Sequence, residues 1–119
     1  MGKIVRYLLV PAMILGLTLN AYAKIIPIGE VTYIKGDDSG SVFVGTTKEN
    51  LKKLYEALIN NEKNKATAMF LNGMGNVFKN GTKIRILEYT GWGDMVKFEV
   101  FDDPDLATYW GYTKVIIGE

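Results

Sequence analysis

Residues 81–100, GTKIRILEYTGWGDMVKFEV, decide the fold class of this chain. Apolar residues alternate with charged ones at 83–86 and again at 96–100, and a Gly-Trp-Gly-Asp segment at 91–94 separates the two runs. Strict alternation is typical of a strand with one face buried and the other in water. Glycine-rich segments between such runs are typical of turns. The stretch therefore predicts two half-buried strands joined by a turn.

Further short strands are predicted on both sides of this stretch. Upstream, an apolar pair at 77–78 leads into the Asn80-Gly81 turn signal. Downstream, an aspartate-rich turn at 102–105 precedes predicted strands at 109–112 and 115–117. Strands this short, with turn signals between them, predict a small barrel or sandwich.

The segment 24–45 is predicted to form strands as well. Its β-forming residues at 25–34 and the apolar run 42–44 are separated by the turn-forming cluster 36–41. We expect the two strands to pair as a hairpin with a wide loop.

Residues 46–72 have a helical period instead. Thr46 and Glu49 fit a capping box at the start, Asn60-Asn61 predicts a break, and Asn72-Gly73 predicts a left-handed cap at the end. One apolar face is predicted for the first helix, and it contains Leu51, Leu54, Tyr55, Leu58 and Ile59. A second helix at 63–71 is expected to point three residues inward, namely Ala66, Met69 and Phe70.

These patterns predict an α+β fold that is mostly β. We expect a single domain over residues 24–119, a small barrel or sandwich against which a helical segment at about 46–72 packs. No repeat, low-complexity tract or linker divides this part of the chain.

Residues 1–23 have the features of a secretory signal peptide. Lys3 and Arg6 make a positively charged start, the run 7–19 is apolar, and Ala21-Tyr22-Ala23 fits a cleavage site. The apolar run has 13 residues, short of the roughly 20 that span a bilayer. We expect cleavage after Ala23 and export to the periplasm or the extracellular space, with an uncleaved anchor as the alternative.

Composition excludes several classes of function. The chain has 14 basic and 13 acidic residues, and loss of Lys3 and Arg6 would leave 12 basic residues and a net charge of about −1. A nucleic-acid binder or a polybasic membrane-surface protein would show a basic excess. The chain has no Cys and no His, which excludes disulfides, Cys- or His-based zinc sites and His general bases.

Residues 81–116 resemble bacterial SH3-like domains. The shared pattern is Gly-Thr before an Ile-rich strand at 81–87, the alternating strand 96–100, and Gly-aromatic before the last apolar run, here 111–116. Upstream, the pieces at 43–47 and 74–78, with the Leu-rich helix between them, resemble small exported bacterial SH3-like proteins of uncharacterised function. In those a helix interrupts the barrel. The resemblance implies an SH3-like barrel with a helical insertion. It covers roughly residues 42–117, and the usual Gly-Trp-Val is Gly-Tyr-Thr at 111–113.

Four aromatic residues at strand ends and turns are the candidate ligand-binding residues: Trp92, Tyr89, Tyr109 and Trp110. Aromatic side chains of this kind line the grooves with which SH3 domains bind extended peptides. Alternation along the strand places Tyr109 and Gly111 on one face, and Trp110 and Tyr112 on the other. The alternative is that Tyr109 or Trp110 belongs to the core with Tyr112, which leaves Trp92 as the exposed residue.

The acidic residues do not indicate a catalytic or metal site. Asp102, Asp103 and Asp105 are predicted to form a solvated turn rather than a cation site. Three acids near the aromatic hairpin could in principle serve glycoside hydrolysis, but nothing in the pattern brings them together: Glu88, Asp94 and Glu99. We expect no catalytic residue, metal or cofactor.

The sequence therefore predicts an exported, non-enzymatic binding module. Its expected ligand is peptidoglycan or a cell-envelope protein, with no nucleic acid and no membrane contact after cleavage. The alternatives are a small inhibitor or exclusion factor that acts on a protein partner, and a minor hydrolase.

Overall fold

The computed structural model describes residues 25–103 and 105–118, so the predicted signal peptide lies outside the described residues. Nine elements follow one another along this part of the chain: β1 (Val31–Tyr33), β2 (Ser41–Gly45), α2 (Lys48–Ile59), α3 (Lys63–Leu71), β3 (Gly75–Lys79), β4 (Lys83–Tyr89), β5 (Met95–Val100), β6 (Thr108–Tyr112) and α4 (Thr113–Ile116).

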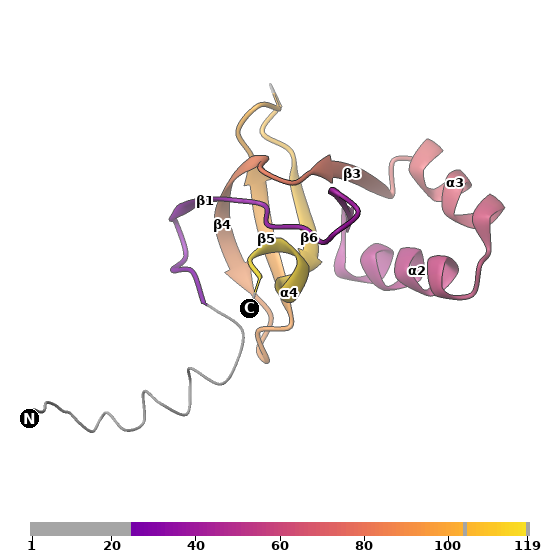
Figure 1. Ribbon diagram of the computed structural model, residues 1–119, viewed down its shortest axis with the longest axis horizontal. Helices are drawn as coiled ribbons and strands as arrows, with labels where there is room; N and C mark the ends of the chain where they lie inside the picture. Colours follow the sequence, from indigo (N-terminus) through magenta and orange to yellow (C-terminus); the bar gives the residue numbers. More distant parts are fainter. Residues whose placement is uncertain (1–24, 104, 119) are drawn as a thin grey trace, which may run out of the picture.

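The strands form one antiparallel sheet in the order β1-β4-β5-β6-β2-β3 (Figure 1). The alternating stretch at its centre pairs as predicted, with Ile84 opposite Val100 and Ile86 opposite Phe98. These four side chains are at most 3% exposed, so the apolar half of the alternation makes the core. The predicted α+β class, dominated by β structure, is confirmed.

The sheet is not closed into a barrel, and here the expectation was too specific. Strand β1 pairs only with β4, and β3 pairs only with β2, so both are edges of the ladder. Helix α4 lies beside the chain that follows β1: the N–H groups of Lys35 and Gly36 donate to the carbonyls of Ile116 and Val115, both at 2.8 Å. Ile116 is fully buried in the main core. The short helix α4 therefore covers a part of the core that additional paired strands would cover in a closed barrel.

The predicted hairpin between the first two strands is wrong. Strand β1 pairs with β4 at Val31–Arg85, whereas β2 pairs with β3 along its whole length. The connecting segment is held by partners other than β2: Ile34 donates to Thr82 at 2.9 Å, and Gly36 donates to Val115. Local turn signals identified the loop but could not identify these distant partners.

The last predicted strand, 115–117, is also wrong, because the chain turns into α4 instead. The turn brings Ile116 back against Gly111, where an added Cβ atom would lie 2.6 Å from the Ile116 Cγ1 atom. Residues Ile116 and Ile117 are buried. The apolar run was correctly predicted as core, but it enters the core from a helical turn.

The helical segment has the predicted two helices, separated at residues 60–62. Its N-cap is one residue later than predicted: the Thr47 side chain accepts from the Asn50 N–H at 3.0 Å. The Thr46 hydroxyl donates instead to the Met74 carbonyl. The proposed capping box with Glu49 is therefore wrong. The left-handed residue after α3 is Gly73, with φ of 73°, as predicted.

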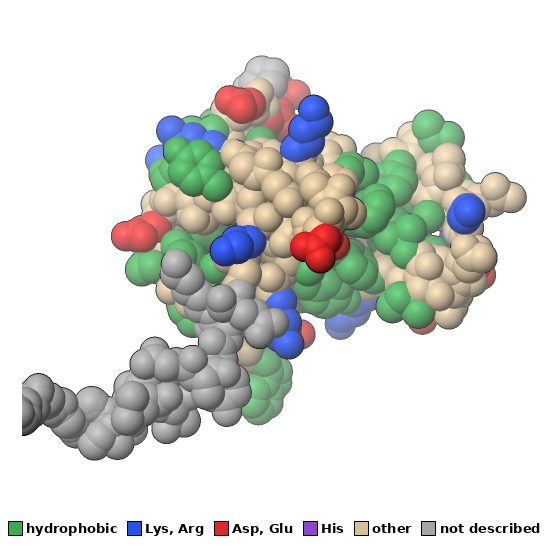
Figure 2. All heavy atoms as spheres, in the orientation of Figure 1, with side chains coloured by type: hydrophobic (Ala, Val, Ile, Leu, Met, Phe, Trp, Pro, Cys, Tyr) green, Lys and Arg blue, Asp and Glu red, His purple; other side chains and the backbone are tan. Residues whose placement is uncertain are grey.

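The helices α2 and α3 pack together to one side of the sheet, next to β2 and β3 (Figure 1). A second apolar cluster joins them, formed by Leu54, Ala57, Ala66 and Met69 with Phe43 and Phe70 against it. Figure 2 shows apolar side chains gathered at this junction and charges scattered over the rest of that face. Ile59, predicted to face inward, is 79% exposed because α2 ends there.

Among the described residues, none of the helices combines the length and apolar character that crossing a membrane requires.

Candidate functional site

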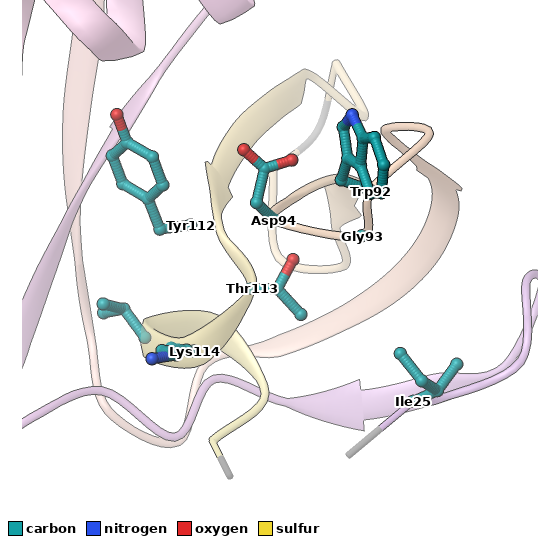
Figure 3. A pocket seen from close by; sticks show the side chains of 8 residues that line it. Ile25, Trp92, Gly93, Asp94, Tyr112, Thr113 and Lys114 are labelled. Atoms are coloured by element: carbon teal, nitrogen blue, oxygen red, sulfur yellow. The ribbon is translucent and has the colours of Figure 1, made fainter. Parts of the chain in front are cut away.

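A pocket of about 470 Å³ opens where the β4–β5 turn meets helix α4 and the start of the described chain (Figure 3). Ligand pockets typically enclose about 300–1,000 Å³. Its walls come from three separate parts of the sequence and consist of Ile25, Trp92, Gly93, Asp94, Tyr112, Thr113, Lys114 and Val115. The surface that these residues present to the pocket is mainly apolar, so the pocket favours a largely apolar group.

Trp92 forms the outer rim and is 96% exposed. It lies in a tight turn between two glycines, and Gly93 has a left-handed φ of 74° that favours glycine. Two backbone bonds close the turn: Gly93 N–H donates to the Thr90 carbonyl at 2.8 Å, and Thr90 N–H donates to Met95 at 3.0 Å. The indole therefore projects from an ordered turn and makes no part of the core.

Asp94 is held at the base of the same turn. The Thr90 hydroxyl donates to its carboxylate at 2.5 Å and accepts from the Met95 N–H at 3.1 Å. The Asp94 carbonyl accepts from the Thr113 N–H at 3.0 Å, which ties the turn to α4. These bonds fix the carboxylate relative to both walls of the pocket.

Tyr112 makes the opposite wall. Its ring packs edge-to-face on Tyr55 of α2, with ring centres 4.8 Å apart. Burial raises the pKa of the Tyr112 phenol, and the negative charge of Asp94 raises it further. In Figure 3 the Asp94 carboxylate lies between the rings of Tyr112 and Trp92. The pocket therefore has a carboxylate flanked by two aromatic side chains.

Thr113 contributes an unusual polar group to this wall. The residue is 1% exposed, and its Oγ1 atom has no hydrogen-bond partner. In Figure 3 this hydroxyl is directed toward the turn that carries Gly93 and Asp94. An unpaired buried hydroxyl costs about 1–3 kcal/mol, and such a group in a pocket wall is a hydrogen-bonding position that a ligand could complete.

The four aromatic residues predicted as ligand-binding do not form one surface. Trp92 alone is exposed, while Tyr109 and Trp110 are 9% and 8% exposed. The two buried residues lie on opposite faces of β6, as the alternation predicted: Tyr109 packs with Phe98 in the main core, and Trp110 packs in a separate cluster with Leu51 and Met95. Both side chains are therefore largely buried, because both faces of β6 are covered, and neither lines the pocket with Trp92.

Tyr89 is half-buried and has a structural role. Its hydroxyl donates to the Ile26 carbonyl at 2.6 Å and accepts from the Ile26 N–H at 3.0 Å. Burial raises the pKa of this phenol. Tyr89 thus holds the start of the described chain on the sheet, next to Ile25 in the pocket wall, and contributes to the site by positioning it.

The other acidic residues do not converge on the pocket. Glu88 lies opposite Lys97 in the ladder, and Glu99 lies 3.6 Å from Arg85. The predicted aspartate turn is confirmed, since the Asp105 N–H bonds the Asp103 carboxylate at 2.9 Å. Within the described ranges, no group of three or more His, Cys, Asp or Glu side chains could hold a metal ion.

A second hollow of about 630 Å³ lies at the other end of the sheet, between strands β3 and β5 and the aspartate turn. Its acidic rim consists of turn residues, of which Asp102 and Asp105 are exposed, and none of its described lining residues has a buried polar atom without a partner. It is therefore the weaker candidate.

The sequence identified Trp92 but missed the rest of the pocket. Tyr112 was assigned to the core, and Thr113 and Val115 were assigned to the approach and start of a strand. One signal in the sequence could have indicated these wall residues. The Gly-Tyr-Thr sequence at 111–113 differs from the Gly-Trp-Val that SH3-like domains usually have, and it lies where β6 ends and α4 begins. Comparisons with family models, curated proteins and solved structures gave no significant match.

Proposed function

We propose that this chain is an exported, non-enzymatic binding module of SH3-like architecture, and that it contacts a cell-envelope protein or peptidoglycan through the Trp92 pocket. One observation carries the proposal: an almost fully exposed tryptophan, held on an ordered turn, forms the rim of a mainly apolar pocket. Tryptophan and tyrosine are enriched among the residues that dominate binding energy at interfaces.

The SH3-like assignment is supported by two features of the fold. Short antiparallel strands pair through the central β4–β5 hairpin, and the helices interrupt the sheet between β2 and β3. The second feature is the helical insertion that the resemblance implies. Export is supported by the pattern of residues 1–23.

Binding is favoured over hydrolysis by the chemistry of the pocket wall. Asp94 is the one carboxylate among the lining residues of the described chain, whereas glycoside hydrolysis uses two acids about 5–9 Å apart across one cleft. Glu88 and Glu99 face cationic partners on neighbouring strands instead. The raised pKa of Tyr112 keeps its phenol protonated at neutral pH, so it is a poor general base.

A protein ligand is favoured over a glycan. Sugars present many hydroxyl groups that need hydrogen-bond partners, whereas the surface of this pocket is mainly apolar. An amino-acid side chain with an apolar stem fits that composition better.

The test is capture of envelope components by the protein purified from cells that express the full chain. Wild type and Trp92→Ala are compared on envelope extract and on isolated peptidoglycan. Because Trp92 is 96% exposed, the melting temperature should stay within about 1–2 °C of wild type, as for a neutral surface change. Capture of the ligand should fall tenfold or more, about 1.4 kcal/mol.

Lys79→Ala, an exposed change at the far end of the sheet, is the matched control and should capture like wild type. Equal capture by Trp92→Ala and wild type would remove this pocket from the proposed function.

A further inference from the structure

The Trp92 pocket combines mainly apolar walls with one carboxylate among its described lining residues, that of Asp94. Asp94 is exposed, and it is fixed by the Thr90 hydroxyl and by the bond from the Thr113 N–H to its own carbonyl. The carboxylate lies between the rings of Trp92 and Tyr112 (Figure 3). This juxtaposition has a specific chemical meaning, because each of the three groups attracts positive charge.

Aromatic rings attract cations through the negative charge of their faces, and tryptophan does so most strongly. A carboxylate adds a charge-assisted hydrogen bond to an ammonium or guanidinium group. Trp92 is free to present its ring face because 96% of its surface is exposed. A cation placed at Asp94 would therefore contact the carboxylate and the indole together.

The remaining walls fit the stem of such a side chain. Ile25 and Val115 are apolar wall residues that a chain of methylene groups can contact. The Thr113 hydroxyl is buried and unpartnered in the wall beside Asp94. Because the residue is only 1% exposed, an amine can reach this oxygen only by entering the wall beside Asp94.

Of the described residues that line the pocket, Lys114 is the cation. It lies in α4, on the wall across from the turn that carries Trp92 and Asp94 (Figure 3). The negative end of the pocket is thus the turn side.

We propose that the pocket takes a lysine-type side chain of a partner protein, with the aliphatic stem against Ile25 and Val115 and the ammonium group at Asp94 and Trp92. The inference rests on the proposed function and names the group that is recognised. A partner segment that presents an exposed lysine supplies both the apolar stem and the charge.

The experiment uses three blocked tripeptides, Ala-X-Ala, in which X is lysine, Nε-acetyl-lysine or norleucine. Each is titrated into the isotope-labelled protein purified from cells that express the full chain. The two tryptophan indole N–H signals are followed by NMR, and Trp92→Phe assigns the signal of Trp92. We expect the lysine peptide to shift the Trp92 signal and to bind at least fivefold more tightly than either neutral peptide.

Two variants test the role of the carboxylate. Asp94→Asn keeps an acceptor for Thr90 and should abolish the preference for lysine. Asp102→Asn, an exposed acid in the turn at the other end of the sheet, is the matched control and should retain it.

Thr113→Val should keep the fold, because it removes an unpaired hydroxyl, and should weaken binding of the lysine peptide twofold or more.

The outcomes separate this inference from the proposed function. Equal binding of all three peptides, or an undiminished lysine preference in Asp94→Asn, would overturn the inference and leave a neutral binding pocket. If no peptide shifts the Trp92 signal, the inference also fails, and Trp92-dependent capture from extract then decides the proposed function separately. Displacement of the lysine peptide by isolated peptidoglycan, but not by envelope protein, would assign the amine to the polymer and overturn a protein partner.

Discussion

Two tryptophans of this chain have opposite roles for reasons that lie in their immediate neighbours. Trp92 lies between glycines in a four-residue turn, where the side chain cannot reach the core. Trp110 lies in the middle of β6, where alternation directs it to the face covered by Leu51 and Met95. The Lys48 ammonium lies 5.3 Å from the centre of its ring. A tryptophan is therefore exposed at position 92 and buried at position 110.

Gly45 is a second position at which a single residue controls the structure. It pairs with Gly75 and with Trp110 in neighbouring strands. A Cβ atom at position 45 would lie 2.4 Å from the backbone nitrogen of Leu51. Helix α2 can approach the sheet this closely only because the residue beneath it has no side chain.

Gly45→Ala should therefore lower the free energy of unfolding by about 1–3 kcal/mol, as overpacking does. The atoms it meets are backbone atoms of a helix, which cannot move aside independently. Gly91→Ala is the control, since a Cβ atom there has nothing within 4 Å, and its effect should stay within about 0.5 kcal/mol. Chemical denaturation of both variants measures the difference, and equal stability would show that α2 does not rest on Gly45.

At the scale of elements, α2 shows how packing selects among residues of one predicted face. Leu51, Leu54 and Ala57 are fully buried, whereas Ile59 at the end of the same helix is exposed. Leu51 packs with Trp110, while Leu54 and Ala57 pack with α3. The helix therefore joins two separate clusters, and its apolar stripe is divided between the sheet and the second helix.

Leu54→Ala should reduce stability by about 2–5 kcal/mol, the range for opening a cavity in a core. Leu54 is 0% exposed, and both helices lose contacts when its side chain is truncated. Ile59→Ala is the matched control because Ile59 is 79% exposed, and it should change stability by less than about 0.5 kcal/mol. Thermal or urea melts of the two variants make the comparison, and an unchanged melt of Leu54→Ala would contradict the described packing.

At the scale of the whole molecule, the pocket exists because distant segments meet. The β4–β5 turn, the short helix α4 and the residues just after the predicted leader each supply one wall. Tyr89 holds the segment that contains Ile25 and Ile26 on the sheet through two hydrogen bonds to the backbone of Ile26. The pocket is thus formed at the end of the sheet, and it depends on the chain being folded as a unit.

The predicted leader ends only two residues before Ile25 of the pocket wall. We expect the exported protein to begin at Lys24, since Ala21-Tyr22-Ala23 fits a signal peptidase site. Mass spectrometry of the protein from the exported fraction should give the mass of residues 24–119. Recovery of the full-length chain alone, in the membrane fraction, would instead support the uncleaved anchor.

The sequence by itself determined the local features of this protein. Alternation identified β4 and β5, and helical period identified α2 and α3. Glycine-containing turns identified the C-terminal end of α3 and the exposure of Trp92. These features depend on neighbours within a few residues, so a single sequence contains the information that specifies them.

Only the tertiary structure decided which strands pair and where the pocket lies. Strand β1 joins β4 across some fifty residues, and the apolar run at 115–117 becomes a helical end because Ile116 must fit against Gly111. An apolar run contains no sign of the partner that will bury it. Trp92, Asp94 and Tyr112 meet in one pocket as a consequence of those long-range contacts. For that reason the sequence singled out one residue of the candidate pocket, and only the fold showed which others line it.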